Sequence, residues 1–547
     1  MRRWNGWGDE TVRVPLPAPA ARMLEERLGP GTPPLDATLA DLVAEVSASD
    51  LPPHPLITAE PVDRVRHARG QSLPDWIALR SGCIGRVPDG VAYPASEAEV
   101  RDLLRYAAEV EARLIPYGGG TSVAGHLTPP AGEQPVLTVD LSRMHRLRRL
   151  DETSRLATFG AGVRGPDLEA ELRARGYTLG HFPQSWELST LGGWVATRSS
   201  GQQSLGYGRI EQLFAGGRLE APDGTLELPP FPASAAGPDV RELVLGSEGR
   251  LGVITEATVR VRPVPQEERF DAVLLPDRER GYAAARSIAQ AELPLSMVRL
   301  LGPEETSVTL MLAGRERLPG VVEWLLSWRG IGEERCLLLL GVSGSGSTHS
   351  AARREALALA LDAGCVQLGR SPGRHWKRNR FRSAYLRNTL WEAGYAVDTV
   401  ETAARWSRIP RLVNSVEEAL RSGLGGEEER VFAFSHLSHL YPTGSSVYVT
   451  YLYRIARDPE ETLGRWQLLK AAATRAIQEQ GGTLSHQHGV GVDHRPYLET
   501  EKGAMGIAAL RALCAAFDPA AIMNPDKLLP QEEECGTLAG AIGSGRG

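Results

Sequence analysis

This chain carries the segment Pro116-Tyr117-Gly118-Gly119-Gly120-Thr121-Ser122 directly after an apolar run, residues 112–115, that predicts a strand. Three successive glycines permit backbone angles and close approaches that a Cβ atom would prevent. Their N–H groups, together with the two hydroxyls that follow, can surround an anion. The segment therefore predicts either a phosphate-binding loop or an ordinary glycine turn, and the glycines alone do not separate the two.

Two familiar phosphate motifs are excluded. A P-loop needs a lysine after its last glycine, whereas Thr121 follows Gly120. Residues 160–165 match the dinucleotide fingerprint in form, between a strand-like run and a helical run. However, residues 181–208 are rich in Pro, Gly and Ser and do not continue a series of strand and helix repeats. We therefore do not predict a nicotinamide site.

The composition is that of a globular protein with several domains. At 547 residues the chain is too long for one ordinary core, which predicts two or three domains. A net charge of −6 offers no electrostatic case for nucleic acid as a partner. Since no apolar run reaches the roughly 18 residues of a spanning helix, we expect a cytoplasmic protein. The five cysteines are scattered and odd in number, which indicates reduced, structural thiols.

Three loops of glycine and hydroxylated residues adjoin predicted strands. The first is the glycine segment, the second is residues 190–201, which we expect to be poor in helix, and the third is residues 246–257. Strands are predicted at 136–140, 155–160 and 253–262, and a capping-box spacing of Ser96 and Glu99 predicts a helix to about Glu111. Three such loops predict the wall of one extended cofactor site.

In this order, the glycine loop, Thr190-Leu191-Gly192-Gly193-Trp194 and residues 246–254 resemble the FAD-binding domain of the vanillyl-alcohol-oxidase type of flavoprotein. Within it, residues 88–529 resemble the alkylglycerone-phosphate synthase (alkyl-dihydroxyacetonephosphate synthase) branch. The resemblance implies an α+β protein with a two-subdomain PCMH-type FAD-binding domain. The implied division is a helical N-terminal module at 1–85, the FAD-binding domain at 86–266, an α+β cap (substrate) domain at 267–470, a C-terminal helical segment at 471–531 and a disordered tail at 532–547.

The resemblance also implies that FAD is bound non-covalently, with its diphosphate at the glycine loop. Backbone amides suit the diphosphate, and small residues let a long cofactor lie flat between two subdomains. The residues assigned to the cofactor in this way are Pro116, Tyr117, Gly118, Gly119, Gly120, Thr121, Ser122, Gln184, Ser185, Ser189, Thr190, Thr197, Arg198, Ser199, Ser200, Glu248, Gly249, Leu251, Gly252, Val253 and Ile254.

Catalytic and substrate residues are implied in the same way. Arg387, within the basic stretch 370–387, matches a substrate-binding arginine, and Arg299 matches an arginine needed for activity; guanidinium groups suit a phosphorylated substrate. Most charges of that stretch are expected to form a solvated face. Tyr448 matches a proton donor, although strand aromatics are usually core residues. His486 and His488 suit proton transfer near neutral pH.

A metal site is the rival interpretation of these histidines. A sister group of 2-hydroxy-acid dehydrogenases carries a His/Asp-rich metal motif upstream of a related His-Gly run. Here the upstream histidines, His436 and His439, are three residues apart and do not form that motif. We therefore predict no metal.

The chain departs from the family pattern at two places. Gln487 stands where the family has the second of three consecutive histidines, and Gln184 stands where it has an aspartate near the flavin. A neutral amide can form hydrogen bonds but cannot act as an acid or base near pH 7. The two departures do not change the expectation of FAD binding. They concern the reaction, because each removes an ionisable group that the family has at the site.

The leading hypothesis is the synthase reaction, in which the acyl group of acyl-dihydroxyacetone phosphate is exchanged for a fatty alcohol, with flavin N5 as a covalent trap. The alternative is an FAD-dependent oxidoreductase acting on a 2-hydroxy acid or related alcohol. A flavin-binding protein without activity is a third hypothesis. The expected partner is a small-molecule or lipid substrate carrying a phosphate; peripheral contact with a membrane and a homodimer are further expectations.

Overall fold

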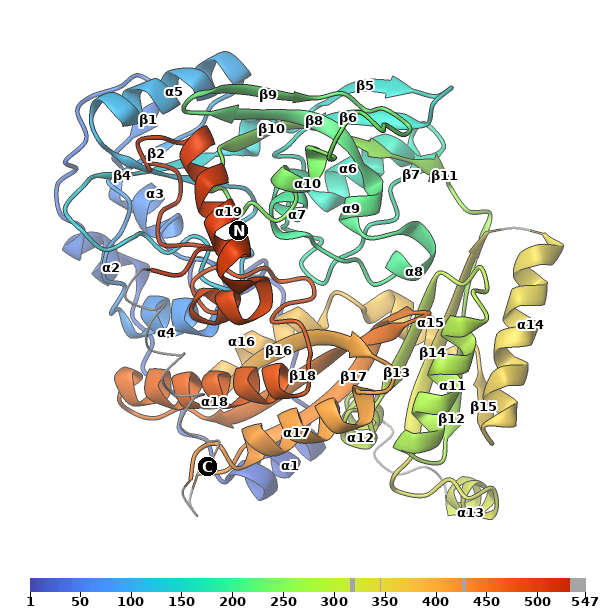
Figure 1. Cartoon of the computed structure of the whole chain (residues 1–547). Helices are drawn as coiled ribbons and strands as arrows, with labels where there is room; N and C mark the ends of the chain where they lie inside the picture. Colours follow the sequence, from blue (N-terminus) through green and yellow to red (C-terminus); the bar gives the residue numbers. More distant parts are fainter. Residues whose placement is uncertain (315–319, 345, 426–428, 532–547) are drawn as a thin grey trace.

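A computed structural model describes residues 1–314, 320–344, 346–425 and 429–531. The tail predicted at 532–547 lies outside these residues. Helices and strands alternate irregularly, and most neighbouring strands are antiparallel, which confirms the predicted α+β class (Figure 1). The strands are β1 Ile57–Thr58, β2 Gly90–Ala92, β3 Arg113–Tyr117, β4 Val136–Asp140, β5 Leu147–Asp151, β6 Leu156–Gly160, β7 Tyr177–Thr178, β8 Phe214–Ala221, β9 Gly224–Leu228, β10 Val253–Arg260, β11 Arg262–Pro263, β12 Glu267–Leu275, β13 Met297–Leu301, β14 Cys336–Gly344, β15 Val366–Gly369, β16 Tyr395–Arg405, β17 Phe432–Tyr441 and β18 Gly444–Arg454.

The helices cover these sheets and connect their strands. They are α1 Ala18–Leu28, α2 Leu39–Glu45, α3 Pro61–Arg66, α4 Leu73–Ser81, α5 Glu97–Glu109, α6 Gly165–Arg173, α7 Leu191–Thr197, α8 Ser204–Tyr207, α9 Ile210–Leu213, α10 Arg241–Val244, α11 Arg278–Gln290, α12 Pro303–Leu312, α13 Gly320–Trp328, α14 Ser347–Asp362, α15 Ser371–Asn379, α16 Ser383–Glu392, α17 Ile409–Arg421, α18 Pro459–Glu479 and α19 Leu498–Phe517. None of the helices in the described part of the chain is long and apolar enough to cross a bilayer.

Two sheets of the predicted flavin domain share one apolar core, and β1 of the predicted N-terminal module joins the first of them. A four-stranded sheet has the order β1-β2-β4-β3, with β4 parallel to both β2 and β3, and a five-stranded antiparallel sheet has the order β5-β6-β10-β8-β9. Because β6 pairs antiparallel with β10, the fingerprint-like residues 160–165 do not open a parallel strand–helix repeat. The two sheets are the two predicted subdomains.

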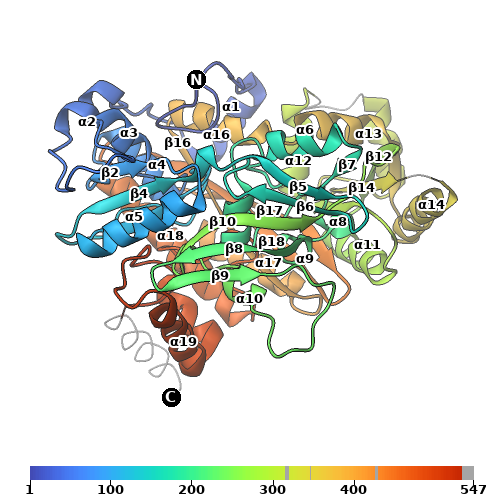
Figure 2. The ribbon, with the colours of Figure 1, turned by 90° about the horizontal axis from the view of Figure 1, so that it is seen from above.

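The predicted cap domain is built on a seven-stranded sheet of order β15-β12-β14-β13-β17-β18-β16. Helices α11, α14, α17 and α18 bury one face of this sheet in the largest apolar cluster of the described residues. Figure 1 shows α17 and α18 on the lower side of the sheet and the flavin domain on the upper side. In the view from above (Figure 2), β8 and β10 overlap β17 and β18, so the two domains form stacked layers.

Both ends of the chain join these layers. Trp7 and Trp76 pack into the core beneath the cap sheet, and Leu24 of α1 packs with Phe432. At the other end, Met523 forms a bridge with Leu114 and lies in the core of the flavin domain. The division of the chain at 85, 266 and 470 stays a prediction.

The local predictions were confirmed except in the second loop. Strand β4 matches the predicted 136–140, and the Ser96 side chain caps α5 by accepting a hydrogen bond from the Glu99 N–H. The expectation of a helix-poor run at 190–201 was wrong, because these residues contain α7, which the Thr190 side chain caps. A Cβ atom on Gly192 would crowd Ala161, so the small residues allow close helix packing rather than a loop.

Candidate functional site

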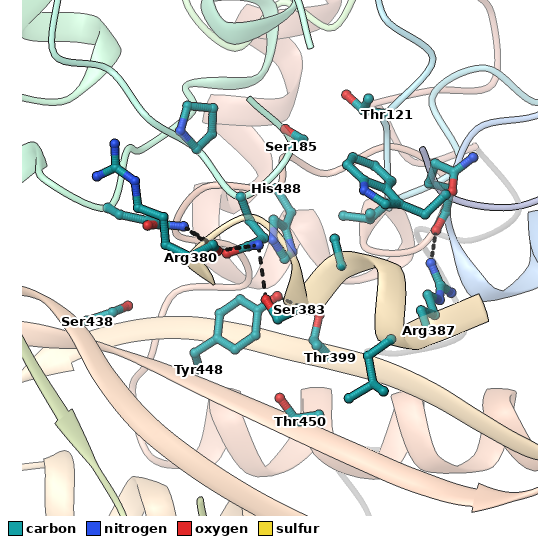
Figure 3. Close-up of a pocket in the computed structure, with 18 of the residues that line it drawn as sticks. Thr121, Ser185, Arg380, Ser383, Arg387, Thr399, Ser438, Tyr448, Thr450 and His488 are labelled. Carbon is teal, nitrogen blue, oxygen red and sulfur yellow. Dashed lines mark hydrogen bonds between the residues drawn. The ribbon is translucent and has the colours of Figure 1, made fainter. Parts of the chain in front are cut away.

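A cavity of about 1330 Å³ lies between the flavin domain and the open face of the cap sheet (Figure 3). A pocket for one small molecule typically measures roughly 300–1,000 Å³. The cavity is thus large enough for a cofactor and a substrate side by side. Figure 3 shows Tyr448 and Thr450 rising from the sheet, His488 above Tyr448, and Arg387 on a neighbouring helix.

The glycine loop forms one wall of the cavity at the end of β3. A Cβ atom on Gly118 would collide with the Thr190 hydroxyl, and one on Gly119 would collide with the carbonyl oxygen of Leu188. Gly120 has a φ of 61°, in the left-handed region that favours glycine. The three glycines therefore let the backbone lie between the segment 188–190 and the cavity, where an anion can approach the N–H groups. This cradle fits the diphosphate of FAD.

Most of the predicted cofactor residues line this cavity, and three do not. Arg198 forms an ion pair with Glu242 and is 40% exposed at its side chain, while Leu251 and Val253 are buried in the apolar core. Those that line the cavity are Pro116, Tyr117, Gly118, Gly119, Gly120, Thr121, Ser122, Gln184, Ser185, Ser189, Thr190, Thr197, Ser199, Ser200, Glu248, Gly249, Gly252 and Ile254.

Glu248 connects three segments of the site. Its carboxylate accepts hydrogen bonds from the N–H groups of Val490 and Gly491 at 2.6 and 2.8 Å, and it lies 3.0 Å from Nε2 of His126. The other nitrogen of His126 is 2.5 Å from the Ser122 hydroxyl. A buried carboxylate with these partners fixes the glycine loop relative to the loop that follows His488.

His126 and Asn524 are two of the cavity residues that the sequence analysis did not predict. His126 has no motif of its own and joins the site through Ser122 and Glu248. Asn524 donates hydrogen bonds to the carbonyls of His126 and Glu248, at 3.2 and 2.8 Å, and its buried Oδ1 has no partner within the described residues. The left-handed backbone of Asn524, with a φ of 36°, belongs to the segment Ile522-Met523-Asn524-Pro525, which directly follows the C-terminal helix region in the sequence.

One carboxylate positions the His-Gln-His loop. Glu401 of β16 accepts hydrogen bonds from the N–H groups of His486, Gln487 and His488 at 2.9–3.2 Å, and from the Ser485 hydroxyl at 2.6 Å. Such charge-assisted hydrogen bonds are about twice as strong as neutral ones. The loop is therefore held rigidly above the cap sheet.

The two histidines of this loop differ in position. His486 does not line the cavity: its Nε2 lies 2.6 Å from an Arg209 nitrogen and 2.7 Å from the Tyr441 hydroxyl, and its ring stacks on His439. Because a guanidinium can only donate, Nε2 of His486 must be the acceptor and is already occupied. His488 does line the cavity, and burial lowers its pKa, against the opposing effect of Glu401. Of the two, His488 alone can accept a proton from a substrate in this arrangement.

Tyr448 lies between two imidazoles. Its ring stacks on His436 at 5.0 Å and meets His488 edge-on at 5.8 Å, and its hydroxyl donates to Thr399 at 3.2 Å. Burial raises the pKa of Tyr448 to about 12. The hydroxyl is therefore protonated at neutral pH and can act as a donor.

Arg387 lines the cavity from α16. One guanidinium nitrogen donates to the carbonyl of Gln71 at 2.5 Å, and the group stacks over Trp76 at 4.2 Å. Its Nε and its other terminal nitrogen are buried and have no partner within the described residues. Buried donors without partners are rare and costly, so this group is suited to an anionic ligand.

Arg299 reaches the same cavity from β13. It donates to Glu305 at 3.0 Å, and Glu305 lies 2.8 Å from Nδ1 of His436.

Gln184, on the flavin side, forms hydrogen bonds with the cap domain: its amide donates to the carbonyl of Arg380 at 2.9 Å and to the Ser383 hydroxyl at 3.1 Å. An aspartate could not donate these bonds, so the amide joins the two domains at the edge of the cavity.

A large part of the remaining cavity lining is apolar. It continues along the cap sheet and past α1 and α12, away from the His-Gln-His loop. Residues that line this apolar part include Leu24, Val308, Leu339, Val397, Phe434 and Leu452. The cavity is thus polar at one end and apolar at the other, a shape that suits a molecule with a polar head and a long chain.

Comparison with known proteins identifies the family. The family described as "FAD binding domain" matches residues 88–228, and the one described as "FAD linked oxidases, C-terminal domain" matches residues 264–528. The alkyldihydroxyacetonephosphate synthase of Dictyostelium discoideum is 30% identical, over 97% of this chain and 94% of its own. That of Caenorhabditis elegans is 31% identical, over 85% and 80%. The glycolate oxidase subunit of Bacillus subtilis is 26% identical, over 82% and 90%.

Solved structures agree with these relatives. A crystal form of alkyldihydroxyacetonephosphate synthase matches with a TM-score of 0.81 at 27% identity, covering 96% of this chain and 99% of the other. The structure of p-cresol methylhydroxylase matches with a TM-score of 0.65 at 13% identity, which shows a shared fold alone. These matches confirm the PCMH-type FAD-binding fold. The chain is an FAD-dependent enzyme and belongs to the alkyldihydroxyacetonephosphate synthase family.

Proposed function

We propose that this enzyme exchanges the acyl group of an acyl-dihydroxyacetone phosphate for a long-chain alcohol, which makes an ether lipid precursor. The observation that carries the proposal is the divided cavity, with an apolar half for a lipid chain and a polar half in which Arg387 has unpartnered donors. A dehydrogenase of small 2-hydroxy acids would not need the apolar half. The family relationship supports the same reaction over the oxidoreductase alternative.

The chain's own residues divide the work of this reaction. Arg387 binds the phosphate, and the apolar half of the cavity orients the chain and excludes water. His488 accepts a proton from the substrate carbon, and Tyr448 donates one toward the substrate oxygen. Arg299 helps to neutralise the charge at the polar end. FAD, when bound at the glycine loop, supplies the reactive centre that holds the substrate carbon during the exchange.

The proposal is tested on the purified protein. We expect a yellow protein whose FAD is released by denaturation, because the family relationship supports non-covalent binding. Acyl-dihydroxyacetone phosphate and a labelled fatty alcohol should give labelled ether product without oxygen or an electron acceptor. Flavin left on the precipitated chain would contradict non-covalent binding. Bleaching of the flavin by a 2-hydroxy acid, with electrons passed to a dye and no exchange, would support the dehydrogenase instead.

Removing Arg387 should weaken substrate binding. Loss of a charge-assisted hydrogen bond costs about 1.5–3 kcal/mol. Arg387→Ala should therefore raise the substrate concentration needed for half-maximal rate by roughly ten- to a hundredfold. FAD content should not change. Arg374→Ala is the matched control, because Arg374 is exposed on the neighbouring helix α15 and does not line the cavity. If both variants need the same substrate concentration for half-maximal rate, Arg387 has only a structural role.

We also propose that the apolar end of the cavity opens toward a membrane surface. Leu312 at the end of α12 is 39% exposed and lines the cavity, as do the exposed Arg378 and Arg382. Helix α13, next along the chain, exposes Trp324 and Trp328 by 56% and 76%. Exposed tryptophan and arginine side chains are typical of contact with a lipid interface.

Vesicles test this contact. The protein should float with vesicles of anionic phospholipid, and replacing both Trp324 and Trp328 with serine should reduce the bound fraction several-fold. Exchange with a short-chain substrate in free solution should stay unchanged, since neither tryptophan lines the cavity. Equal flotation of the variant and the wild type would show that α13 does not meet the membrane.

A further inference from the structure

One pair of buried ionisable residues in the cavity has no part in the reaction so far. His436 of β17 and Glu305 of α12 both line the cavity, and each is 8% exposed. His436 and His439 are three residues apart in the sequence and do not form the metal motif of the dehydrogenases. Among the described residues, no group of three histidine, cysteine or acidic side chains could hold a metal ion.

The contacts of His436 determine which of its nitrogens is free. Its Nδ1 lies 2.8 Å from Glu305 and 3.3 Å from an Arg299 nitrogen. Although burial opposes it, the interactions with His436 and Arg299 lower the pKa of Glu305 to about 2, so the carboxyl is ionised. A carboxylate only accepts, and it is the closer neighbour, so Nδ1 carries the proton and Nε2 carries the lone pair. This is the arrangement by which an acidic side chain orients a histidine base.

The groups that face His436 favour its neutral form. Burial, followed by the positive charge of Arg299, lowers the pKa of His436, whereas Glu305 raises it. The Tyr448 ring stacks on the imidazole, and His439 lies on the same strand. The lone pair of Nε2 is therefore available at neutral pH.

The register of the cap sheet places His436 beside the polar end of the cavity. His436 pairs with Leu301 on one side and Tyr448 on the other, and Tyr448 pairs with Glu401. Two residues further along the strands, the corresponding row contains Phe434, Thr450 and Thr399, and the row after it contains Phe432, Leu452 and Val397. Along the strands, the lining thus changes from ionisable to apolar within three rows. A hydroxyl at the end of a lipid chain held in the apolar part would lie near His436.

We propose that His436, oriented by Glu305, is the base that accepts the hydroxyl proton of the incoming long-chain alcohol. This inference rests on the proposed exchange reaction and assigns one of its steps. The alcohol O–H bond breaks and its proton moves to Nε2 of His436, while an oxygen electron pair forms the new C–O bond to the substrate carbon. The acyl group leaves that carbon as a carboxylate with its bonding pair, so the proton taken by His436 balances the charge and no oxidant is needed. His488 and Tyr448 serve the substrate carbon and oxygen.

Fatty acid release and alcohol incorporation can be measured separately, and comparing them distinguishes a base at His436 from a structural residue. His436→Gln keeps a hydrogen-bonding amide but cannot accept a proton. In a single turnover the variant should bind FAD and release the first equivalent of fatty acid from acyl-dihydroxyacetone phosphate within about threefold of the wild-type rate, whereas incorporation of the alcohol should fall roughly 10²–10⁴-fold, the range of a positioned base. Glu305→Gln should slow the same step to a smaller extent. A fluorinated long-chain alcohol, whose hydroxyl is more acidic, should recover part of the loss in His436→Gln.

Each other outcome identifies what failed. If His436→Gln incorporates alcohol as fast as the wild type, or loses acid release and incorporation equally, His436 is not this base. The same conclusion follows if the fluorinated alcohol brings no recovery. If the wild type neither releases acid nor forms ether product, the proposed function is wrong, and this inference falls with it.

Discussion

Alanine at position 488 should lower turnover roughly 10²–10⁴-fold, the range typical of a positioned acid or base, whereas alanine at position 486 should cost far less. Both histidines are held through their N–H groups by Glu401, so the backbone of the loop should survive either change. The difference lies in the side chains. His488 lines the cavity, while Nε2 of His486 is occupied by Arg209 and Tyr441. FAD content should remain unchanged in both variants.

The pH dependence of the wild type gives a second readout. Burial lowers the pKa of His488 below the ordinary imidazole value of about 6.5. A base is active when it is unprotonated, so the rate should decline on the acidic side only below that ordinary value and should be level near pH 7. In His488→Ala this acidic decline should be lost from the residual rate. If His486→Ala and not His488→Ala loses turnover, the assignment of the two rings is reversed; if neither does, the loop only supports the flavin.

The glycine loop and the loop of His486 and His488 were predictable because their chemistry is local. Three glycines, or two histidines beside glycines, indicate a close approach or proton transfer without reference to the rest of the chain. A spacing of two residues, however, does not tell which of the two histidines faces a cavity. That depends on Arg209 and Tyr441, which are 277 and 45 residues away from His486.

The carboxylates that organise the site could not be found in this way. Glu401 stands 85 residues before the first N–H group that it binds, and Glu305 stands 131 residues before His436. Neither carboxylate belongs to a sequence motif. Each acquires its hydrogen-bond partners only because folding buries it between elements that are distant in the sequence. The same reason explains the wrong expectation for residues 190–201, where close packing on Ala161 and not local propensity decides that a helix forms.

Removing the hydroxyl of Tyr448 should also lower the rate of exchange strongly. Tyr448→Phe keeps the ring stacked on His436 and edge-on to His488 and deletes only the group that donates to Thr399. If this hydroxyl donates a proton toward the substrate oxygen, exchange should fall roughly 10²–10⁴-fold. Tyr451→Phe is the matched control: Tyr451 lies on the same strand, is fully buried in the core on the opposite face, and donates to Asp398. That variant should lose stability rather than turnover.

The raised pKa of Tyr448 makes a further prediction about the wild type. A tyrosine ordinarily ionises near pH 10, but burial raises the pKa of this one to about 12. Since the donor is active only while protonated, its contribution is fully present below pH 10 and should decline only as the pH approaches the raised value. The rate of exchange, measured from neutral pH to about pH 10, should therefore show no alkaline decline due to this residue. An alkaline decline near pH 9 that disappears in Tyr448→Phe would contradict the burial of the hydroxyl, and full turnover in that variant would make Tyr448 a core aromatic with no part in the chemistry.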